Sequence, residues 1–208
     1  MSELVKRKQS NLQLSTQMEP RLFATNDMAS WYDSLNRRSL ATTLRSQKAL
    51  SNGRYVNVWV EDSEWDPAGT MYKVTQGVAD LVGEKFALPY TGIFDMVTGL
   101  AGSLPWGAHG YPADLIGATQ DIQIVVANLS PDSSAGGLLG FYDSTNSYRK
   151  SAHGDSNEAL LLFIDSESLV TAYQDMIIST LGHEFMHMIN FYQRTVMKSV
   201  DGNILHFE

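Results

Sequence analysis

Several segments of the chain carry apolar residues at the two-residue period of a β-strand. In RYVNVWVED, three valines alternate with Tyr55, Asn57 and Trp59, and such β-branched and aromatic residues are typical of strands. The uninterrupted apolar run ALLLFID indicates a strand that is buried on both faces. Two further runs, DIQIVVANL and the glycine-flanked GLLGFYDS, complete the set. The predicted strands cover residues 54–62, 121–129, 137–144 and 159–165.

Other segments carry apolar residues at helical spacing. The predicted helices cover residues 29–53, 69–87, 90–102 and 171–194. The first is the most loosely spaced, and Gly53 stands where it can cap the end. The last is the longest, and Thr171 followed by Gln174 fits a capping box at its start. Residues 103–119 are rich in glycine, proline and aromatic residues, which predicts a surface loop.

The order of these elements predicts an α/β fold. Strands early and late in the chain, with helices between them, favour a mixed sheet on which the helices pack. A hydrophobic fraction of 43% with 10% aromatic residues is enough to build a core. We expect residues 1–53 to form an N-terminal arm with a helical portion, and residues 54–208 to form one α/β domain.

Charge is divided unevenly along the chain. Residues 1–50 hold 8 Lys and Arg against 4 Asp and Glu, whereas the remainder holds 7 against 19. An acidic body argues against nucleic acid as a partner, because phosphates would be repelled. The mildly basic arm is suited to packing against that body. No apolar run reaches the 18 residues that predict a membrane span, and the N-terminal residues lack the apolar core of a signal peptide.

The long predicted helix at 171–194 has two chemically different faces. At roughly 100° per residue, its apolar residues form one stripe that faces the sheet. The stripe consists of Ile177, Leu181, Phe185, Met188 and Tyr192, and is widened by Ile178 and Ile189. His183 and His187 fall on the opposite side. We therefore expect the two histidines to point into a cleft rather than into the core.

The segment HEFMH at 183–187 has the spacing that a zinc site requires. His183 and His187 are neighbours one helical turn apart, so their ring nitrogens can converge on one ion at about 2.0–2.1 Å. The chain has no cysteine, so any ligands come from His, Asp or Glu. Glu184 lies beside the pair and can act as general base toward a metal-activated water. This is the H-E-x-x-H pattern; a surface helix with two unrelated histidines is the simpler alternative.

The segment TLGHEFMHMINFYQR resembles the active-site helix of the zinc neutral metallopeptidases of the hyicolysin family, a bacterial group of the zincin type. A weaker likeness extends over residues 54–195. The resemblance implies a secreted, zinc-dependent endopeptidase that acts on proteins or peptides. It also implies a zincin upper subdomain, in which a twisted sheet lies over the active-site helix. In that fold an antiparallel edge strand pairs with the substrate backbone, and residues 137–142 are the candidate; an ordinary hairpin arm is the alternative reading.

Two histidines do not complete a catalytic zinc site, which usually has three protein ligands. The longer H-E-x-x-H-x-x-G-x-x-H pattern is absent, because Asn190 and Gln193 occupy its glycine and third histidine positions. In other zincins the third zinc ligand is a glutamate that lies later in the chain than the second histidine. Glu208 has a suitable separation, but DGNILHFE reads as turn and strand. We therefore expect the third ligand to be Glu208 or a residue outside this sequence, with the catalytic domain incomplete at its C-terminus.

Other polar residues carry weaker predictions. Asn190 or Arg194 could orient a ligand from the helix surface, and His206 could stabilise an oxyanion, although a plain strand residue is the simpler reading. His109 and His153 lie in predicted loops and are expected to be solvated. Several oxygen-bearing side chains could bind calcium, but their spacing lacks the calcium-loop pattern and favours ordinary turns. These are Asp143, Asn146, Asp155, Asn157 and Glu158.

The sequence thus supports a zinc metalloendopeptidase with His183 and His187 as metal ligands and Glu184 as the catalytic base. The alternative from a different class is an incomplete or inactive metal-binding domain that serves as an interaction module. A third reading is a structural α/β domain without metal. Zinc content together with peptide hydrolysis separates the three.

Overall fold

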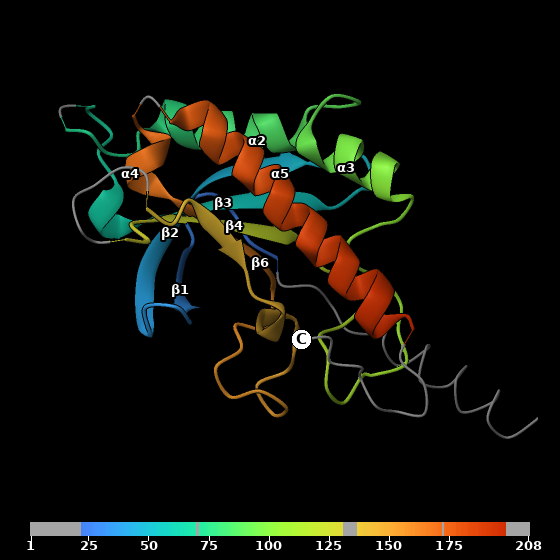
Figure 1. The fold of residues 1–208 in the computed structure, drawn as a ribbon. Helices are drawn as coiled ribbons and strands as arrows, with labels where there is room; N and C mark the ends of the chain where they lie inside the picture. Colours follow the sequence, from blue (N-terminus) through green and yellow to red (C-terminus); the bar gives the residue numbers. More distant parts are fainter. Residues whose placement is uncertain (1–21, 70, 131–136, 172, 199–208) are drawn as a thin grey trace, which may run out of the picture.

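The fold is a six-stranded mixed sheet with helices packed on it, as described by a computed structural model (Figure 1). The structure describes residues 22–69, 71–130, 137–171 and 173–198. The strands are β1 (Met28–Asp33), β2 (Arg38–Ala49), β3 (Tyr55–Glu61), β4 (Ile122–Ala127), β5 (Gly140–Tyr142) and β6 (Leu160–Asp165). Their order across the sheet is β1-β2-β3-β4-β6-β5.

The centre of the sheet is parallel and its two sides are antiparallel. Strands β3, β4 and β6 run parallel to one another. On one side β2 and β1 follow as an antiparallel hairpin, and on the other side β5 pairs antiparallel with β6. The four strands predicted from the sequence are confirmed, with shorter bounds than the patterns suggested. The α/β class with a mixed sheet is likewise confirmed.

The helix predicted over residues 29–53 is wrong, because this segment forms the β1–β2 hairpin. Leu40 and Leu44 are four residues apart and imitate a helical repeat. They are in fact alternating inward positions of β2, with the polar residue Thr42 buried between them. After a bulge between Leu44 and Ser46, the polar residue Ser46 is buried on the other face of the sheet, where it donates to Asp80. Because polar side chains occupy two of the buried positions, the two-residue period cannot be seen in the hydrophobic pattern.

The hairpin also changes the place of residues 22–53 in the molecule. Residues Thr42–Ala49 of β2 pair with β3 along the whole length of β3, so β2 continues the central sheet. The Trp31 ring in β1 packs edge-on against the Trp59 ring in β3, with ring centroids 5.4 Å apart. Residues 1–21, the rest of the predicted arm, lie outside the described residues.

Each central strand sends alternate side chains into two apolar layers. Val58, Ile124 and Leu162 belong to the layer beneath the helices. Trp59 and Phe163, at neighbouring positions, belong to a second layer on the opposite face. Strands β4 and β6 are buried at every position, which explains why their sequences are almost wholly apolar, with Gln123 in β4 and the terminal Asp165 in β6 as the polar exceptions.

The main helices cover one face of this sheet (Figure 1). They are α2 (Gln76–Ala87), α3 (Ile93–Ala101) and α5 (Gln174–Asn190), with a single turn, α4 (Ser166–Leu169), before α5. Helix α2 packs over β2 and β3, and α5 packs over β5 and β6. The predicted helices at 69–87 and 90–102 are confirmed with later starts. No helix in the described ranges is long and apolar enough to span a bilayer.

An aromatic cluster ties the three helices together and fixes the height of α5 above the sheet. The Phe185 ring lies 5.0 Å from the Phe86 ring of α2 and 5.8 Å from the Phe94 ring of α3, centroid to centroid. All three side chains are buried. Since such contacts add to the burial of large apolar surfaces, the cluster restrains α5 against rotation about its own axis.

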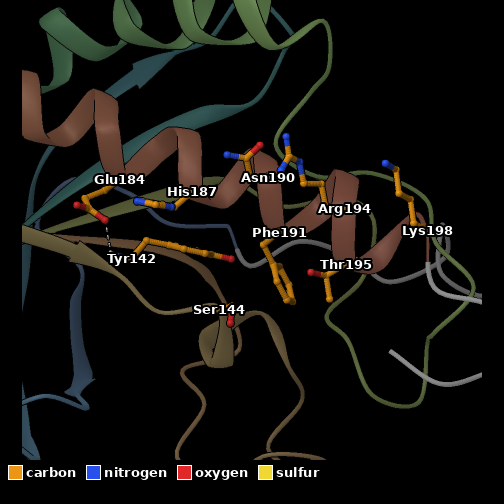
Figure 2. Close-up of a pocket in the computed structure, with 9 residues that line it drawn as sticks. All are labelled: Tyr142, Ser144, Glu184, His187, Asn190, Phe191, Arg194, Thr195 and Lys198. Atoms are coloured by element: carbon orange, nitrogen blue, oxygen red, sulfur yellow. Dashed lines mark hydrogen bonds between the residues drawn. The ribbon is translucent and has the colours of Figure 1, made fainter. Parts of the chain in front are cut away.

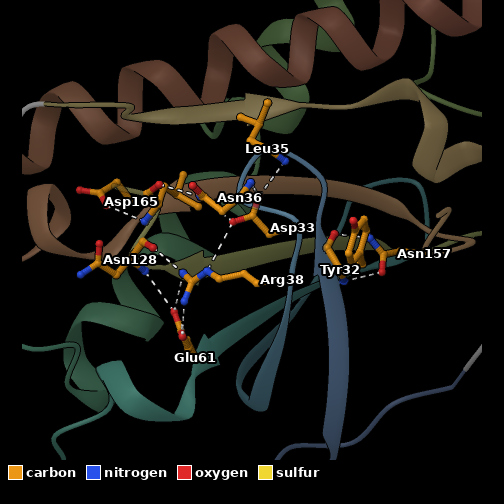
Figure 3. Close-up of polar contacts among 10 residues, drawn as sticks. Tyr32, Asp33, Leu35, Asn36, Arg38, Glu61, Asn128, Asn157 and Asp165 are labelled. Carbon is orange, nitrogen blue, oxygen red and sulfur yellow. Dashed lines mark hydrogen bonds and ion pairs between the residues drawn. The ribbon is translucent and has the colours of Figure 1, made fainter. Parts of the chain in front are cut away.

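Arg38 holds the hairpin against the ends of the parallel strands (Figure 3). Its guanidinium donates to the Glu61 carboxylate at 3.1 Å and to the Asn128 carbonyl at 2.5 Å, and it lies 3.7 Å from the fully buried Asp33 carboxylate. The Asp165 carboxylate accepts from the Leu129 amide nearby. Arg38 therefore links β2 with the ends of β3 and β4.

We expect Arg38→Met to lower the free energy of unfolding by about 2–3 kcal/mol, because it leaves the Asp33 and Glu61 carboxylates without their cation. Partial exposure of Arg38 keeps the loss below that of a fully buried pair. Urea unfolding of the two proteins measures the difference. Arg37→Met is the matched control, since Arg37 is exposed in the adjacent turn; equal losses for both variants would contradict the proposed role of the cluster.

Candidate active site

Helix α5 carries the candidate site, and its core stripe is the one predicted. Six of the seven apolar residues are buried, and Ile178 is partly buried. The helix continues from Asn190 into a π-helical turn, Phe191–Val196. The predicted capping box is wrong, because α5 begins at Gln174 with no side-chain cap. The Thr171 hydroxyl instead donates to the Ser168 carbonyl, and the Gln174 amide to the Leu169 carbonyl, which ties α5 to α4.

His183 and His187 lie on the exposed face of α5 and turn toward each other. Their Nε2 atoms are 3.0 Å apart, and the ring planes stand nearly perpendicular at 83°. One ion at the usual zinc–nitrogen distance of about 2.0–2.1 Å reaches both atoms at this separation. Both rings are accessible from solvent. The pair therefore fits two positions of a zinc coordination sphere.

Glu184 is held beside the histidines by the edge of the sheet. Its Oε2 atom accepts a hydrogen bond of 3.0 Å from the backbone N–H of Tyr142, the last residue of β5 (Figure 2). The side chain is partly buried, whereas the two histidines are exposed. A backbone donor cannot change rotamer, so the bond fixes where the carboxylate points. This contact joins residues 42 positions apart in the sequence.

Gly140 allows β5 to come this close to α5. A Cβ atom at residue 140 would lie 2.8 Å from the Phe163 carbonyl oxygen and 3.1 Å from Cγ2 of Thr180. The first distance is shorter than real Cβ contacts, so any side chain would displace β5 from β6 or from the helix. The absence of a side chain here thus sets the position of the Tyr142 amide under Glu184.

We expect Gly140→Ala to lower the free energy of unfolding by about 1–3 kcal/mol, the usual effect of forcing a methyl group into a filled space. It should also reduce the activity proposed below, because the displaced strand no longer holds Glu184. Thermal unfolding and hydrolysis rates are the measurements. Gly99→Ala in α3 is the control, since nothing lies within 4 Å of its added Cβ; it should leave stability unchanged or slightly higher.

A pocket of about 780 Å³ opens beside Glu184 and His187 and extends along the end of the helix (Figure 2). Asn190 and Arg194, which the sequence offered as weaker candidates for orienting a ligand, line this pocket. Other lining residues were not singled out from the sequence: Tyr142, Ser144, Phe191, Thr195 and Lys198. Phe191, Thr195 and Lys198 follow His187 at helical spacing, and this spacing could have indicated from the sequence that they lie near the site. Nothing local in the sequence indicates that Tyr142 and Ser144 face the helix.

The segment 103–119 forms no regular element, as predicted, but it is not a surface loop. Trp106, His109 and Leu115 are buried within it. The Trp106 and Tyr192 rings pack together, and the Tyr192 hydroxyl donates to the Ala108 carbonyl at 3.0 Å. The loop therefore supports the C-terminal end of α5 beside the pocket.

His109 was expected to be solvated and is instead buried. Its Nε2 bonds to the Ile116 carbonyl at 2.8 Å, and its Nδ1 accepts from the Tyr111 amide at 3.2 Å. Burial lowers the pKa of this ring, and the nearby Arg149 charge acts in the same direction. The neutral ring satisfies both contacts, whereas a second proton on Nδ1 would remove the acceptor for Tyr111. His153 is exposed in its loop, as expected.

The lowered pKa of His109 predicts an acid-sensitive stability. In the unfolded chain the ring binds a proton near pH 6.5, whereas in the folded protein it does so only at lower pH. The contribution of His109 to the free energy of unfolding is therefore complete above about pH 6.5. It is lost as the pH falls below that value, at up to about 1.4 kcal/mol per pH unit. Urea unfolding between pH 5 and 8 measures this slope. His109→Gln should flatten it; an unchanged slope would contradict the assignment.

The oxygen-bearing residues considered for calcium mostly have structural contacts. Asp143 accepts from the Thr145 amide and from the Ser34 hydroxyl. The Asn157 side chain donates to Asn146 Oδ1 and to the Tyr32 carbonyl, which docks this loop on β1. Within the described residues no group of three or more His, Cys, Asp or Glu is placed to hold a metal ion. His206 and Glu208 lie outside those residues.

Comparison with known proteins identifies the family. The family model for Peptidase M30 matches residues 36–202, which is most of the chain. The chain therefore belongs to the M30 peptidases, the hyicolysin family, as the resemblance predicted. Membership implies a metallopeptidase that acts on protein substrates. Among proteins with curated descriptions, none matches the chain.

Proposed function

We propose that the protein is a zinc-dependent endopeptidase in which His183 and His187 bind zinc and Glu184 is the general base. The observation that carries the proposal is the arrangement on α5. Two imidazole Nε2 atoms converge to 3.0 Å on an exposed face, and a carboxylate between them in sequence is fixed by the sheet edge. Membership of a metallopeptidase family supports the same chemistry.

Zinc bound at this position would lower the pKa of a water molecule to about 7 and polarise the carbonyl of the scissile bond. The Glu184 carboxylate then accepts the proton that the attacking water loses. Because the Tyr142 amide occupies one lone-pair direction of Oε2, the remaining acceptor sites of the carboxylate are free to face this water. Glu184 afterwards donates the proton to the leaving amine, which restores the starting state.

We propose that the substrate backbone pairs with β5. This strand is the last in the sheet order, and it is antiparallel to β6. An edge strand offers backbone groups to an extended peptide, which can add as one further strand. Such a peptide would lie between β5 and the pocket next to Glu184. The zincin upper subdomain that the resemblance implies also belongs to the proposal, and the edge position of β5 beside α5 supports it.

A third zinc ligand is also required. We propose a carboxylate from Glu208 or from another residue outside the described part of the chain. An extracellular location belongs to the proposal as well and rests on the family resemblance. The alternative of an inactive metal-binding module draws on the fact that the described residues supply only two neighbouring ligands.

Zinc analysis combined with hydrolysis of a mixed peptide library tests the proposal. We expect about one zinc per chain, cleavage within the peptides, loss of cleavage after chelation, and recovery when zinc is restored. Protein that binds zinc but cleaves no peptide would favour the binding module. Protein that binds no zinc at all would leave only the structural reading.

A further inference from the structure

Two cationic side chains line the pocket beyond His187. Arg194 lies in the π-helical turn that extends α5, and Lys198 lies in the non-helical turn that follows it. Figure 2 shows Glu184, His187, Asn190, Arg194 and Lys198 following one another along this helix. The site proposed above therefore continues into a positively charged subsite.

This subsite contrasts with the rest of the protein. The chain has a formal net charge of −8, and most of its acidic residues follow residue 50. Within the residues that the structure describes, neither Arg194 nor Lys198 forms an ion pair, whereas Arg38, Arg45, Lys48 and Lys73 each do. Both side chains are exposed. Two unpaired cations beside a pocket attract a carboxylate from solution.

The relation between β5 and α5 gives the direction of a bound peptide. At residue 140 the strand lies beside Thr180, and at Tyr142 it lies beside Glu184, so β5 and α5 run in the same direction. A peptide that pairs antiparallel with β5, the more stable arrangement, runs the opposite way. Its residues before the scissile bond then lie toward Arg194, and those after it lie toward Thr180.

The helix rise gives the approximate position in the peptide. Arg194 is seven residues beyond His187, or roughly 10 Å along the axis at about 1.5 Å per residue. An extended peptide covers this distance in about three residues, at about 3.3 Å each. Arg194 thus corresponds to residues two to four before the scissile bond, and Lys198, about 6 Å farther along the axis, extends the subsite toward the earlier of these residues and beyond.

We propose that Arg194 and Lys198 select substrates with an acidic residue two to four positions before the cleaved bond. The inference rests on the endopeptidase function proposed above. Ser144 and Asn190 add polar groups to the subsite, and the Phe191 ring offers an apolar surface for the aliphatic part of a glutamate. The acidic body of the protein disfavours such peptides elsewhere on its surface.

Matched peptides that differ only in Glu or Gln at one position test this. Binding is measured by fluorescence anisotropy on zinc-loaded Glu184→Gln protein, so that turnover does not interfere, and hydrolysis is measured on the wild type. We expect Glu at the predicted positions to bind roughly threefold to tenfold more tightly than Gln at low ionic strength, and less so as salt rises. Glu placed after the cleaved bond should give no preference.

Combined Arg194→Gln and Lys198→Gln replacement should remove the preference, and reversal of both to Glu should favour Lys-containing peptides. Lys85→Gln is the control, because Lys85 is an exposed cation on α2, which packs over β2 and β3. Cleavage without any acidic preference, or a preference only after the cleaved bond, would overturn this inference alone. Failure to bind or cleave any peptide would overturn the proposed function too.

Discussion

Replacement of Glu184 by Gln is expected to reduce peptide hydrolysis by about 10²–10⁴-fold, the usual contribution of a positioned general acid–base group. Glutamine keeps the shape of the side chain and an oxygen that can accept from the Tyr142 amide, but it cannot take a proton from water. Zinc content should remain unchanged, because the carboxylate is not a proposed ligand. Initial rates with a quenched fluorescent peptide and elemental analysis of the same samples measure both quantities.

Glu84→Gln provides the comparison for this variant, since Glu84 is an exposed carboxylate on α2. It should hydrolyse peptides at the wild-type rate. If Glu184→Gln retained more than about a tenth of the activity, the carboxylate would not be the base. If it lost both zinc and activity, Glu184 would act through the metal site, and the assigned role would be wrong.

Replacement of either His183 or His187 by Ala is expected to weaken zinc binding by more than about a hundredfold, since loss of a direct ligand should exceed the 10–100-fold effects of outer partners. Activity should fall with zinc occupancy. The metal-free fold should be unaffected, because both rings are exposed and alanine favours the helix. Competition with a chromophoric chelator measures affinity, and circular dichroism measures the thermal midpoint.

His153→Ala is the matched control for these variants, because His153 is an exposed histidine in the loop before β6. It should bind zinc as the wild type does. Wild-type zinc affinity in both His183→Ala and His187→Ala would refute the metal site. A large loss of thermal stability without metal would instead indicate a structural role for the pair.

The shared role of β5 connects these experiments. The same three-residue strand holds Glu184 through the Tyr142 amide and forms one edge of the sheet. A change that moves β5, such as Gly140→Ala, should therefore affect both the base and substrate binding, whereas Glu184→Gln should affect only the chemical step. Separate measurement of kcat and KM distinguishes the two.

The sequence by itself determined the parts of this protein that depend on near neighbours along the chain. The stripe from Ile177 to Tyr192 and the opposed pair His183 and His187 follow from the repeat of one helix, so the buried and exposed faces of α5 were predicted correctly. The buried strands β4 and β6 were recognised for a similar reason, since apolar residues dominate β4 and run without a break from Leu160 to Ile164 in β6. The family was also recognised from the segment around HEFMH.

Errors arose where polar residues fill inward positions or where a loop is buried. Thr42 and Ser46 occupy buried positions in β2, so the hairpin was mistaken for a helix. His109 is buried because residues 103–119 pack under the end of α5, although their composition is that of a surface loop. In both cases a distant segment, rather than the local pattern, decides which side chains are covered.

Only the tertiary structure decided how the base is fixed and where the pocket extends. The Tyr142 amide reaches Glu184 because β5 pairs with β6 at the sheet edge and Gly140 leaves room for the helix above it. Arg194 and Lys198 become part of a site because the pocket opens along that same helix end. A helical period is a local property and can be read from spacing, whereas contacts between elements depend on strand order and register, which long-range packing sets.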